Sequence, residues 1–100
     1  MEIIFEWDAK KSRLNLEKHK VSFEEAQTIF IDPLLVTFPD DFHSEMEERF
    51  VSIGTSMRER ILLVVHTERE EIRERIIIRI ISCRKATATE RKIYEENESY

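Results

Sequence analysis

Residues 61–85, ILLVVHTEREEIRERIIIRIISCRK, contain the two segments that decide the fold. Ile61–Thr67 is rich in β-branched residues and is apolar on both faces at its start, which is typical of a central strand. Ile76–Cys83 is a second strongly apolar segment and predicts another strand. The charged residues 68–75 lie between the two.

Upstream of this pair the hydrophobic pattern predicts two shorter strands, at Leu34–Phe38 and Arg49–Ile53. A polar stretch, residues 39–47, separates them. A turn is expected over residues 55–60, just before the strand that begins at Ile61.

The N-terminal third begins with a predicted strand over residues 3–7. Asp8 is expected to cap a helix over residues 9–19. The sequence from Ser22 to Glu25 has the pattern of a capping box and starts a second helix, which ends at Asp32-Pro33.

A second capping box, residues 87–90, opens a final helix that includes Ile93 and Tyr94. The predicted order is β-α-α-β-β-β-β-α over a single domain of residues 1–100. Helices before and after a run of consecutive strands favour an α+β fold with a small antiparallel sheet.

The composition excludes several classes of protein. The chain has 100 residues, of which 41% are hydrophobic, enough for a core and too many for wholesale disorder. The single cysteine, Cys83, excludes an internal disulfide framework and fits a reducing cytoplasm. The longest apolar runs are far shorter than the ~20 residues of a membrane helix. The first residues show no signal peptide, so we expect a cytoplasmic protein with no membrane partner.

The net charge of −5 conceals an uneven distribution along the chain. Taken alone it argues against a nucleic acid partner. The segment from Arg79 to Tyr94, however, contains five lysines and arginines against Glu90 alone. If RNA binds, we expect it to bind where Arg79, Arg84 and Lys85 meet.

Arg79 lies between isoleucines in a predicted central strand and therefore needs a partner. The structural interpretation is an ion pair with a carboxylate such as Glu68 or Glu48. The functional interpretation is a guanidinium that grips a phosphate. Ser82 and the two cations after Cys83 follow at the strand end, a common position for functional residues.

Histidine and carboxylate side chains supply candidates for proton transfer. His66 could act as a general base or acid, or simply as a hydrogen-bonded sheet residue. Glu48 lies in the charged run of residues 45–49, which a solvated surface explains equally well. His19, His43 and His66 match no zinc-site spacing, so we expect no metal or other cofactor.

Trp7 and Cys83 have one functional and one structural interpretation each. The Trp7 ring could stack on a nucleobase or pack in the core. Cys83 could be a nucleophile, but its apolar neighbours indicate an inert thiol.

Several strings of residues, taken together and in order, resemble the BrnT family. They are Phe5-Glu6-Trp7-Asp8, Lys18-His19, Val21–Ala26, Phe30–Pro33, His43-Ser44, Glu48–Phe50, Ile53-Gly54, Leu63–Thr67, Arg79–Ser82, Arg84–Thr87, Glu90-Arg91 and Tyr94. The resemblance covers nearly the whole chain. Two positions depart from the family pattern. Lys20 stands where glycine is frequent, and must do without glycine's freedom at positive φ; Cys83 stands where alanine is usual.

The resemblance implies a RelE-like fold and a ribonuclease toxin of a bacterial type II toxin–antitoxin pair. Such a toxin would cleave RNA without a metal, through attack of the substrate's 2′-hydroxyl on the adjacent phosphate. That reaction needs a cationic cradle, a general base and a general acid. The expected catalytic residues are Arg79, Arg84, Arg69, Ser82, His66 and Glu48, and the expected RNA-binding residues are Trp7, Lys85 and Arg91.

The implied partner is a small BrnA-like antitoxin, bound to the toxin in a heterotetramer. The toxin would contact DNA only indirectly, through this antitoxin. An acidic or aromatic antitoxin segment would mask an arginine-rich face. Two alternatives remain open at this point. The chain could be an inactive antitoxin-binding module, or a DNA-binding regulator, although it shows no helix-turn-helix with a basic recognition helix.

Overall fold

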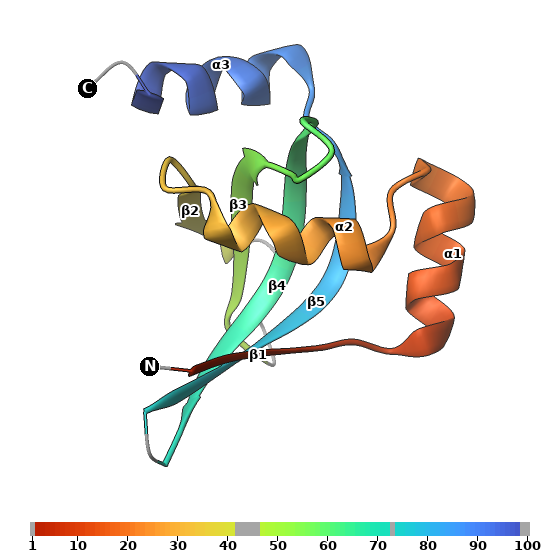
Figure 1. Cartoon of the computed structure of the whole chain (residues 1–100), viewed down its shortest axis with the longest axis vertical. Coiled ribbons are helices and arrows are strands. Elements are labelled where there is room, and N and C mark those ends of the chain that lie inside the picture. The colour runs from red at the N-terminus through yellow and green to blue at the C-terminus, as the bar shows by residue number, and fades with distance from the viewer. Residues whose placement is uncertain (1, 42–46, 73, 99–100) are drawn as a thin grey trace.

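The computed structural model describes residues 2–41, 47–72 and 74–98, and it confirms a mixed α+β fold (Figure 1). In chain order the elements are β1 (Glu2–Glu6), α1 (Ala9–His19), α2 (Phe23–Gln27), the short 3₁₀ helix η1 (Thr28–Ile31), β2 (Val36–Pro39), β3 (Arg49–Thr55), β4 (Ile61–Glu71), β5 (Arg75–Lys85) and α3 (Ala88–Glu98).

The five strands form one sheet in the order β1-β5-β4-β3-β2. Strands β2 to β5 are antiparallel neighbours, as expected, but β1 pairs with β5 in parallel. The prediction of a wholly antiparallel sheet is therefore wrong at this edge. It considered only strands that follow one another in sequence, whereas β1 and β5 are separated along the chain by three helical segments and three strands.

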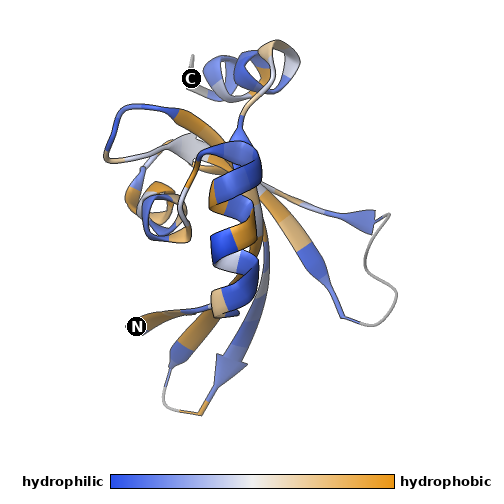
Figure 2. Ribbon diagram, turned by 90° about the vertical axis from the view of Figure 1, so that its right-hand side faces the viewer, coloured by the Kyte–Doolittle hydropathy of each residue, from blue (hydrophilic) through white to orange (hydrophobic). Residues whose placement is uncertain are grey.

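The β4–β5 hairpin is longer than the sequence predicted. The charged residues 68–71 belong to β4, and β5 already begins at Arg75. Glu71 lies opposite Arg75, and Glu68 and Glu70 lie opposite Ile78 and Ile76. A protruding ribbon exposes its charged side chains, so a charged run there does not signal a loop. Figure 2 shows the hydrophilic end of this hairpin extending away from the helices.

One face of the sheet is covered by the helical segments and holds the main core. Fully buried side chains from both layers meet there: Val21, Phe23, Ala26 and Ile29 from the helical side, and Leu62, Val64, Ile80 and Cys83 from the sheet. Gly54 permits the close approach of η1, because a Cβ on it would lie 2.9 Å from Leu35 Cδ1 and 3.1 Å from Ile29 Cβ.

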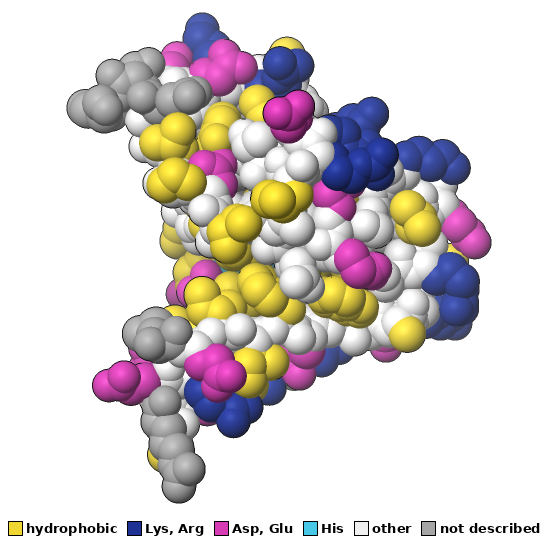
Figure 3. All heavy atoms as spheres, viewed as in Figure 1, with side chains coloured by type: hydrophobic (Ala, Val, Ile, Leu, Met, Phe, Trp, Pro, Cys, Tyr) yellow, Lys and Arg dark blue, Asp and Glu magenta, His cyan; other side chains and the backbone are white. Residues whose placement is uncertain are grey.

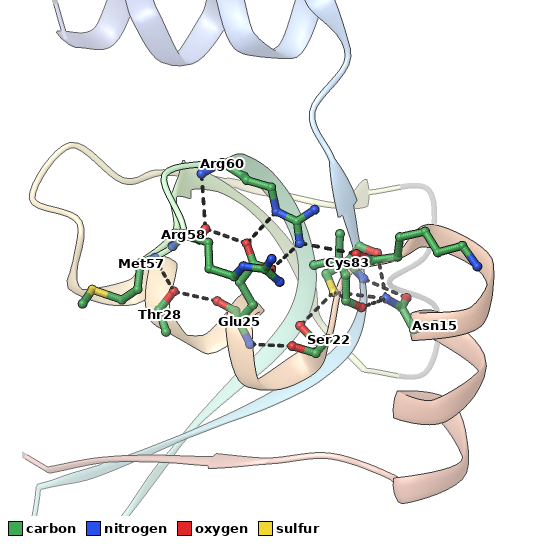
Figure 4. A network of polar contacts seen from close by, with 11 residues as sticks. Asn15, Ser22, Glu25, Thr28, Met57, Arg58, Arg60 and Cys83 are labelled. Atoms are coloured by element: carbon green, nitrogen blue, oxygen red, sulfur yellow. Dashed lines mark hydrogen bonds and ion pairs between the residues drawn. The ribbon is translucent and has the colours of Figure 1, made fainter.

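The predicted caps form, with one difference. The Asp8 carboxylate accepts the Lys11 N–H at 3.0 Å, and Ser22 Oγ accepts the Glu25 N–H at 3.0 Å. Glu25, however, does not complete its capping box by bonding the Ser22 backbone. Its nearly buried carboxylate binds the guanidinium of Arg60 instead, and it accepts the Ser56 hydroxyl at 2.7 Å (Figure 4). This ion pair ties α2 to the turn between β3 and β4.

Helix α1 ends at Lys20, which adopts a left-handed conformation with φ of 61°. Its N–H donates to the carbonyl of Leu16. This is the backbone geometry that glycine occupies most readily, and a lysine there carries a conformational cost. The position at which the sequence departs from the BrnT pattern is therefore a left-handed helix cap.

Helix α1 also takes the place of a sixth strand beside β5. Strand β1 pairs with β5 only as far as Arg79, and beyond that point the edge of β5 faces α1. The buried carboxamide of Asn15 accepts the Cys83 N–H at 3.1 Å and donates to the Cys83 carbonyl at 2.9 Å (Figure 4). One side chain thus satisfies both backbone groups of an edge residue.

Helix α3 packs on the opposite face of the sheet, together with Leu34, and covers one end of it. Tyr94 packs on Ile53 and Leu63 there, and its hydroxyl donates to Asp32 Oδ2 at 2.5 Å. Val51 and Val65 also belong to this face, and both are half-buried. We call this the open face. It carries the polar groups considered next.

Candidate functional site

A row of polar side chains crosses the open face. Strand pairing places Arg49 on β3 opposite Thr67 on β4, Thr67 opposite Arg79 on β5, and Arg79 opposite Glu6 on β1. Residues paired in register project from the same face of a sheet, and neighbouring strands lie ~4.8 Å apart. The two arginines therefore flank a two-strand width of sheet, about 10 Å across.

The Arg79 side chain is half-buried on β5, an interior strand of the sheet, yet it forms no ion pair or hydrogen bond within residues 2–41, 47–72 and 74–98. The predicted structural partners are not bound to it. Glu68 lies on the covered face, 3.7 Å from His66, and Glu48 is exposed without such a contact. The charge of Arg79 is felt at Asp8, whose pKa is lowered chiefly by the Lys11 N–H and in small part by this arginine.

The carboxylate beside Arg79 in register is already engaged. Glu6 accepts Arg69 Nη1 at 2.7 Å, in an exposed ion pair that joins β1 to β4 across β5. The hydrogen bond to Glu6 raises the pKa of Arg69 further. Arg69 is therefore on the open face, as the predicted cradle requires, but one carboxylate balances its charge.

The charge of Arg84 is also balanced by a carboxylate. Its two terminal nitrogens donate to both oxygens of Glu90, at 2.7 and 2.9 Å. This pairing is the main reason that the pKa of Glu90 falls to about 2. Glu90 also completes the expected capping box, accepting the Thr87 N–H at 2.8 Å while Thr87 Oγ1 accepts the Glu90 N–H at 3.2 Å. The arginine is thereby attached to the first turn of α3.

Lys85 and Arg91 lie apart from Arg79. Lys85 is paired with Leu62, a residue of the covered face, whereas Arg84 is paired with Leu63 of the open face. Lys85 and Arg91 line a depression of about 310 Å³ with Arg60, between the β3–β4 turn and α3. The expectation that Arg79, Arg84 and Lys85 meet at one point is therefore wrong, because adjacent residues of a strand point to opposite faces.

His66 is buried on the covered face. Its Nε2 lies 2.7 Å from Ser52 Oγ, and the rings of Phe30 and Phe50 pack on either side. Burial lowers the pKa of His66 to about 4. The ring has no exposed surface, so in this structure it cannot contact a group bound on the open face.

The remaining predicted residues occupy three different settings. The Trp7 ring packs edge-on against Phe23, with 5.9 Å between the ring centroids, at the margin of the core. Ser82 is half-buried and faces the junction of β5 with α1. Glu48 is exposed just before β3, and His43 lies outside the described residues.

Three cationic or polar groups escaped the sequence reasoning. Strand register alone places Arg49 and Thr67 in one row with Arg79. The sequence held part of this signal, because alternation along the predicted strand puts Arg49 on the same face as Val51. Helix α1 with its C-cap Lys20 contains five lysines and arginines against one glutamate. The negative net charge of the N-terminal half of the chain concealed this basic helix. Figure 3 shows dark-blue side chains concentrated on the side of the molecule where α1 lies.

Among the described residues, no group of three His, Cys, Asp or Glu side chains is placed to hold a metal ion. None of the helices in that part of the chain is long and apolar enough to cross a membrane.

The chain was compared with known families, curated proteins and solved structures. The sequence model for "Ribonuclease toxin, BrnT, of type II toxin-antitoxin system" matches residues 7–90. The crystal structure of the Brucella abortus ribonuclease toxin BrnT is similar in fold, with a TM-score of 0.59 and 21% identity over 87% of this chain and 99% of that one. No curated protein matches. Because the family match spans most of the domain, the chain belongs to the BrnT family of ribonuclease toxins of type II toxin–antitoxin systems.

Proposed function

We propose that this BrnT-family toxin is a metal-independent endoribonuclease whose reaction takes place on the open face. The observation that carries the proposal is Arg79: a half-buried guanidinium on that face with no counter-ion among the described residues. A partly desolvated arginine with no ion-pair partner is costly to the fold and is well suited to bind a phosphate through its fork of donors.

In the proposed reaction the ribose 2′-oxygen attacks the adjacent phosphorus and the bond from phosphorus to the 5′-oxygen breaks. The products are a 2′,3′-cyclic phosphate and a free 5′-hydroxyl. One group accepts the 2′-hydroxyl proton, and another donates a proton to the leaving oxygen. Negative charge grows on the non-bridging oxygens, and fixed cations there lower the barrier.

Arg79 is assigned to those oxygens, with Ser82 as a hydroxyl donor farther along β5 and Arg69 as a second cation. Arg84 joins them only when a phosphate displaces Glu90, since that carboxylate now occupies both of its terminal nitrogens. Lys85 and Arg91 extend RNA binding on the covered side.

The proton acceptor has to reach the open face, which argues against His66 in its buried position. Glu6 is the carboxylate in register with Arg79, and its second oxygen is not used by Arg69. We therefore assign proton transfer to Glu6, with the exposed Glu48 beside Arg49 as the alternative.

We also propose that a BrnA-like antitoxin covers the open face, in a heterotetramer that contacts DNA through the antitoxin alone. The half-buried Phe38, Val51 and Val65 lie on the same face as Arg49 and Arg79. A segment with acidic and aromatic side chains would satisfy both the apolar and the cationic parts.

The proposed chemistry is tested by incubating the purified chain with an RNA oligonucleotide in EDTA. We expect cleavage that leaves a cyclic phosphate and a 5′-hydroxyl, and no cleavage when every 2′-hydroxyl is replaced by hydrogen. Cleavage of the all-deoxy substrate, or activity that EDTA abolishes, would contradict the mechanism. Absence of any cleavage, together with normal growth of cells that overproduce the chain, would instead favour an inactive antitoxin-binding module.

A further inference from the structure

We propose that the depression between α1 and β5 binds a nucleotide of the RNA next to the one that is cleaved. The proposal rests on the proposed function of the open face and extends it beyond the sheet. The depression has a volume of about 220 Å³. Its lining includes Lys11, Leu14, Lys18, His19, Ile81 and Ser82.

The depression exists because α1 replaces a strand at the edge of β5. The Asn15 carboxamide fixes the helix to Cys83 by two backbone hydrogen bonds at 2.9 and 3.1 Å. A helix cannot follow a strand edge as closely as another strand does, so a hollow remains beside that anchor. Asn15 is itself buried and forms part of the hollow's wall.

The chemistry of the hollow matches a nucleotide. Leu14 is half exposed and, with Ile81, offers an apolar surface for a base. Lys11 and Lys18 are exposed, one turn of helix to each side of Leu14, and suit the phosphates that flank that base. The half-buried His19 offers an aromatic ring for stacking.

A β-bulge directs this part of β5 toward the hollow. His66 pairs with Ile80 and Val65 pairs with Ser82, which leaves Ile81 as an extra residue without a partner on β4. Bulges are frequent beside active sites, where they redirect side chains. Here the bulge follows Arg79 at the edge of the depression. Ser82 lines the depression and is also assigned to the proposed reaction centre.

The path from the proposed reaction centre to the depression is short. Ser82 follows Arg79 by three residues, about 10 Å along the strand. Glu6 is in register with Arg79, and the N-cap of α1, Asp8, follows Glu6 by two residues, so the start of that helix lies near Arg79. An RNA strand bound at Arg79 therefore reaches α1 over a short distance, past the carboxylates of Glu6 and Asp8 at the end of β1.

The test uses a 2′-O-methyl RNA decamer, which the proposed mechanism cannot cleave, and measures binding by fluorescence anisotropy. The test variant is Lys11→Glu/Lys18→Glu. The matched control is Lys10→Glu/Arg13→Glu, which makes the same charge change on the same helix with residues that do not line the depression.

We expect the test variant to weaken binding about tenfold or more at low salt, and to reduce the slope of log affinity against log salt by about 1.4, the value for two lost phosphate contacts on a single strand. The control should change affinity by less than about threefold. Circular dichroism checks that both variants keep their helices.

Equal effects of the two variants would overturn the proposal, since general electrostatics would explain them. Unchanged RNA binding with loss of antitoxin capture would also overturn it, and would assign the hollow to an acidic segment of the partner. The binding assay does not depend on cleavage. Specific binding without cleavage of ordinary RNA would therefore contradict the proposed function while leaving this site supported.

Discussion

Arg84 is bound by Glu90 through two hydrogen bonds, at 2.7 and 2.9 Å, and Glu90 at the same time caps the helix α3. One carboxylate thus neutralises an arginine of the predicted phosphate cradle and fixes the element that covers one end of the open face. Phosphate binding at Arg84 has to compete with this contact.

Glu90→Gln separates the two roles of this carboxylate, because glutamine retains the capping box but removes the charge. We expect a loss of about 1 kcal/mol in the free energy of unfolding and tighter RNA binding through the freed Arg84. Glu90→Ala should cost about 0.5–1 kcal/mol more, since the hydrogen bond from the Thr87 N–H to the Glu90 side chain is also lost. Urea titration and the anisotropy assay measure both effects.

The stability difference between wild type and Glu90→Gln should also depend on pH. In the folded protein the pKa of Glu90 is lowered to about 2, so the contribution is complete above the ordinary pKa of a glutamate and disappears as the pH falls toward 2. A difference that stayed constant from pH 6 to pH 2 would show that the ion pair does not stabilise the fold.

Asn15→Ala should lower the free energy of unfolding by about 2–4 kcal/mol, because the N–H and C=O of Cys83 lose their buried partner. The matched control is Arg13→Ala, an exposed position on the same helix, which should change stability by less than about 0.5 kcal/mol. Equal stability of the two variants in urea would mean that water satisfies the edge of β5 equally well.

Arg60→Ala should destabilise the protein by about 3 kcal/mol, because the Glu25 carboxylate is left buried without its main partner. Arg58 also approaches Glu25, at 3.8 Å, but its side chain is 73% exposed. Arg58→Ala should therefore cost less than about 0.5 kcal/mol. Thermal unfolding of the two variants side by side distinguishes the buried pair from the exposed one.

The His66 ring should remain neutral in the folded protein down to about pH 5. Burial lowers its pKa from 6.5 to about 4, so folding opposes protonation. The corresponding stability is present above pH 6.5 and is lost as the pH falls through about 4, a total of roughly 3 kcal/mol. NMR titration of the ring in folded protein provides the check. A pKa of 6–7 there would show an accessible histidine and would restore it as a candidate base.

Local sequence signals predicted most elements of the fold. The N-caps Asp8, Ser22 and Thr87 and the hydrophobic periods of the strands are properties of short segments, and each appears in the structure. The parallel pairing of β1 with β5 depends on contacts between distant segments. The hairpin residues 68–71 were misjudged because exposed strands and loops share the same charged composition.

The site was predictable in part. Arg79 was identified from a local conflict, a charge between isoleucines, and that conflict persists in the structure as a guanidinium without a partner among the described residues. Burial of His66 and capture of Arg84 by Glu90 depend on packing that no local pattern encodes. Arg49 and the hollow at α1 appear only once strand register and the bulge are known.

The most direct test of the central claim compares RNA cleavage in EDTA by wild type, Arg79→Ala and Arg75→Ala. Arg75 is a partly exposed arginine on the same strand, four residues from Arg79 and 3.8 Å from Glu2, and serves as the control. We predict that Arg79→Ala lowers the cleavage rate at least ~100-fold while Arg75→Ala stays within about twofold of wild type. Wild-type cleavage by a folded Arg79→Ala protein would contradict the assignment of the open face as the catalytic surface.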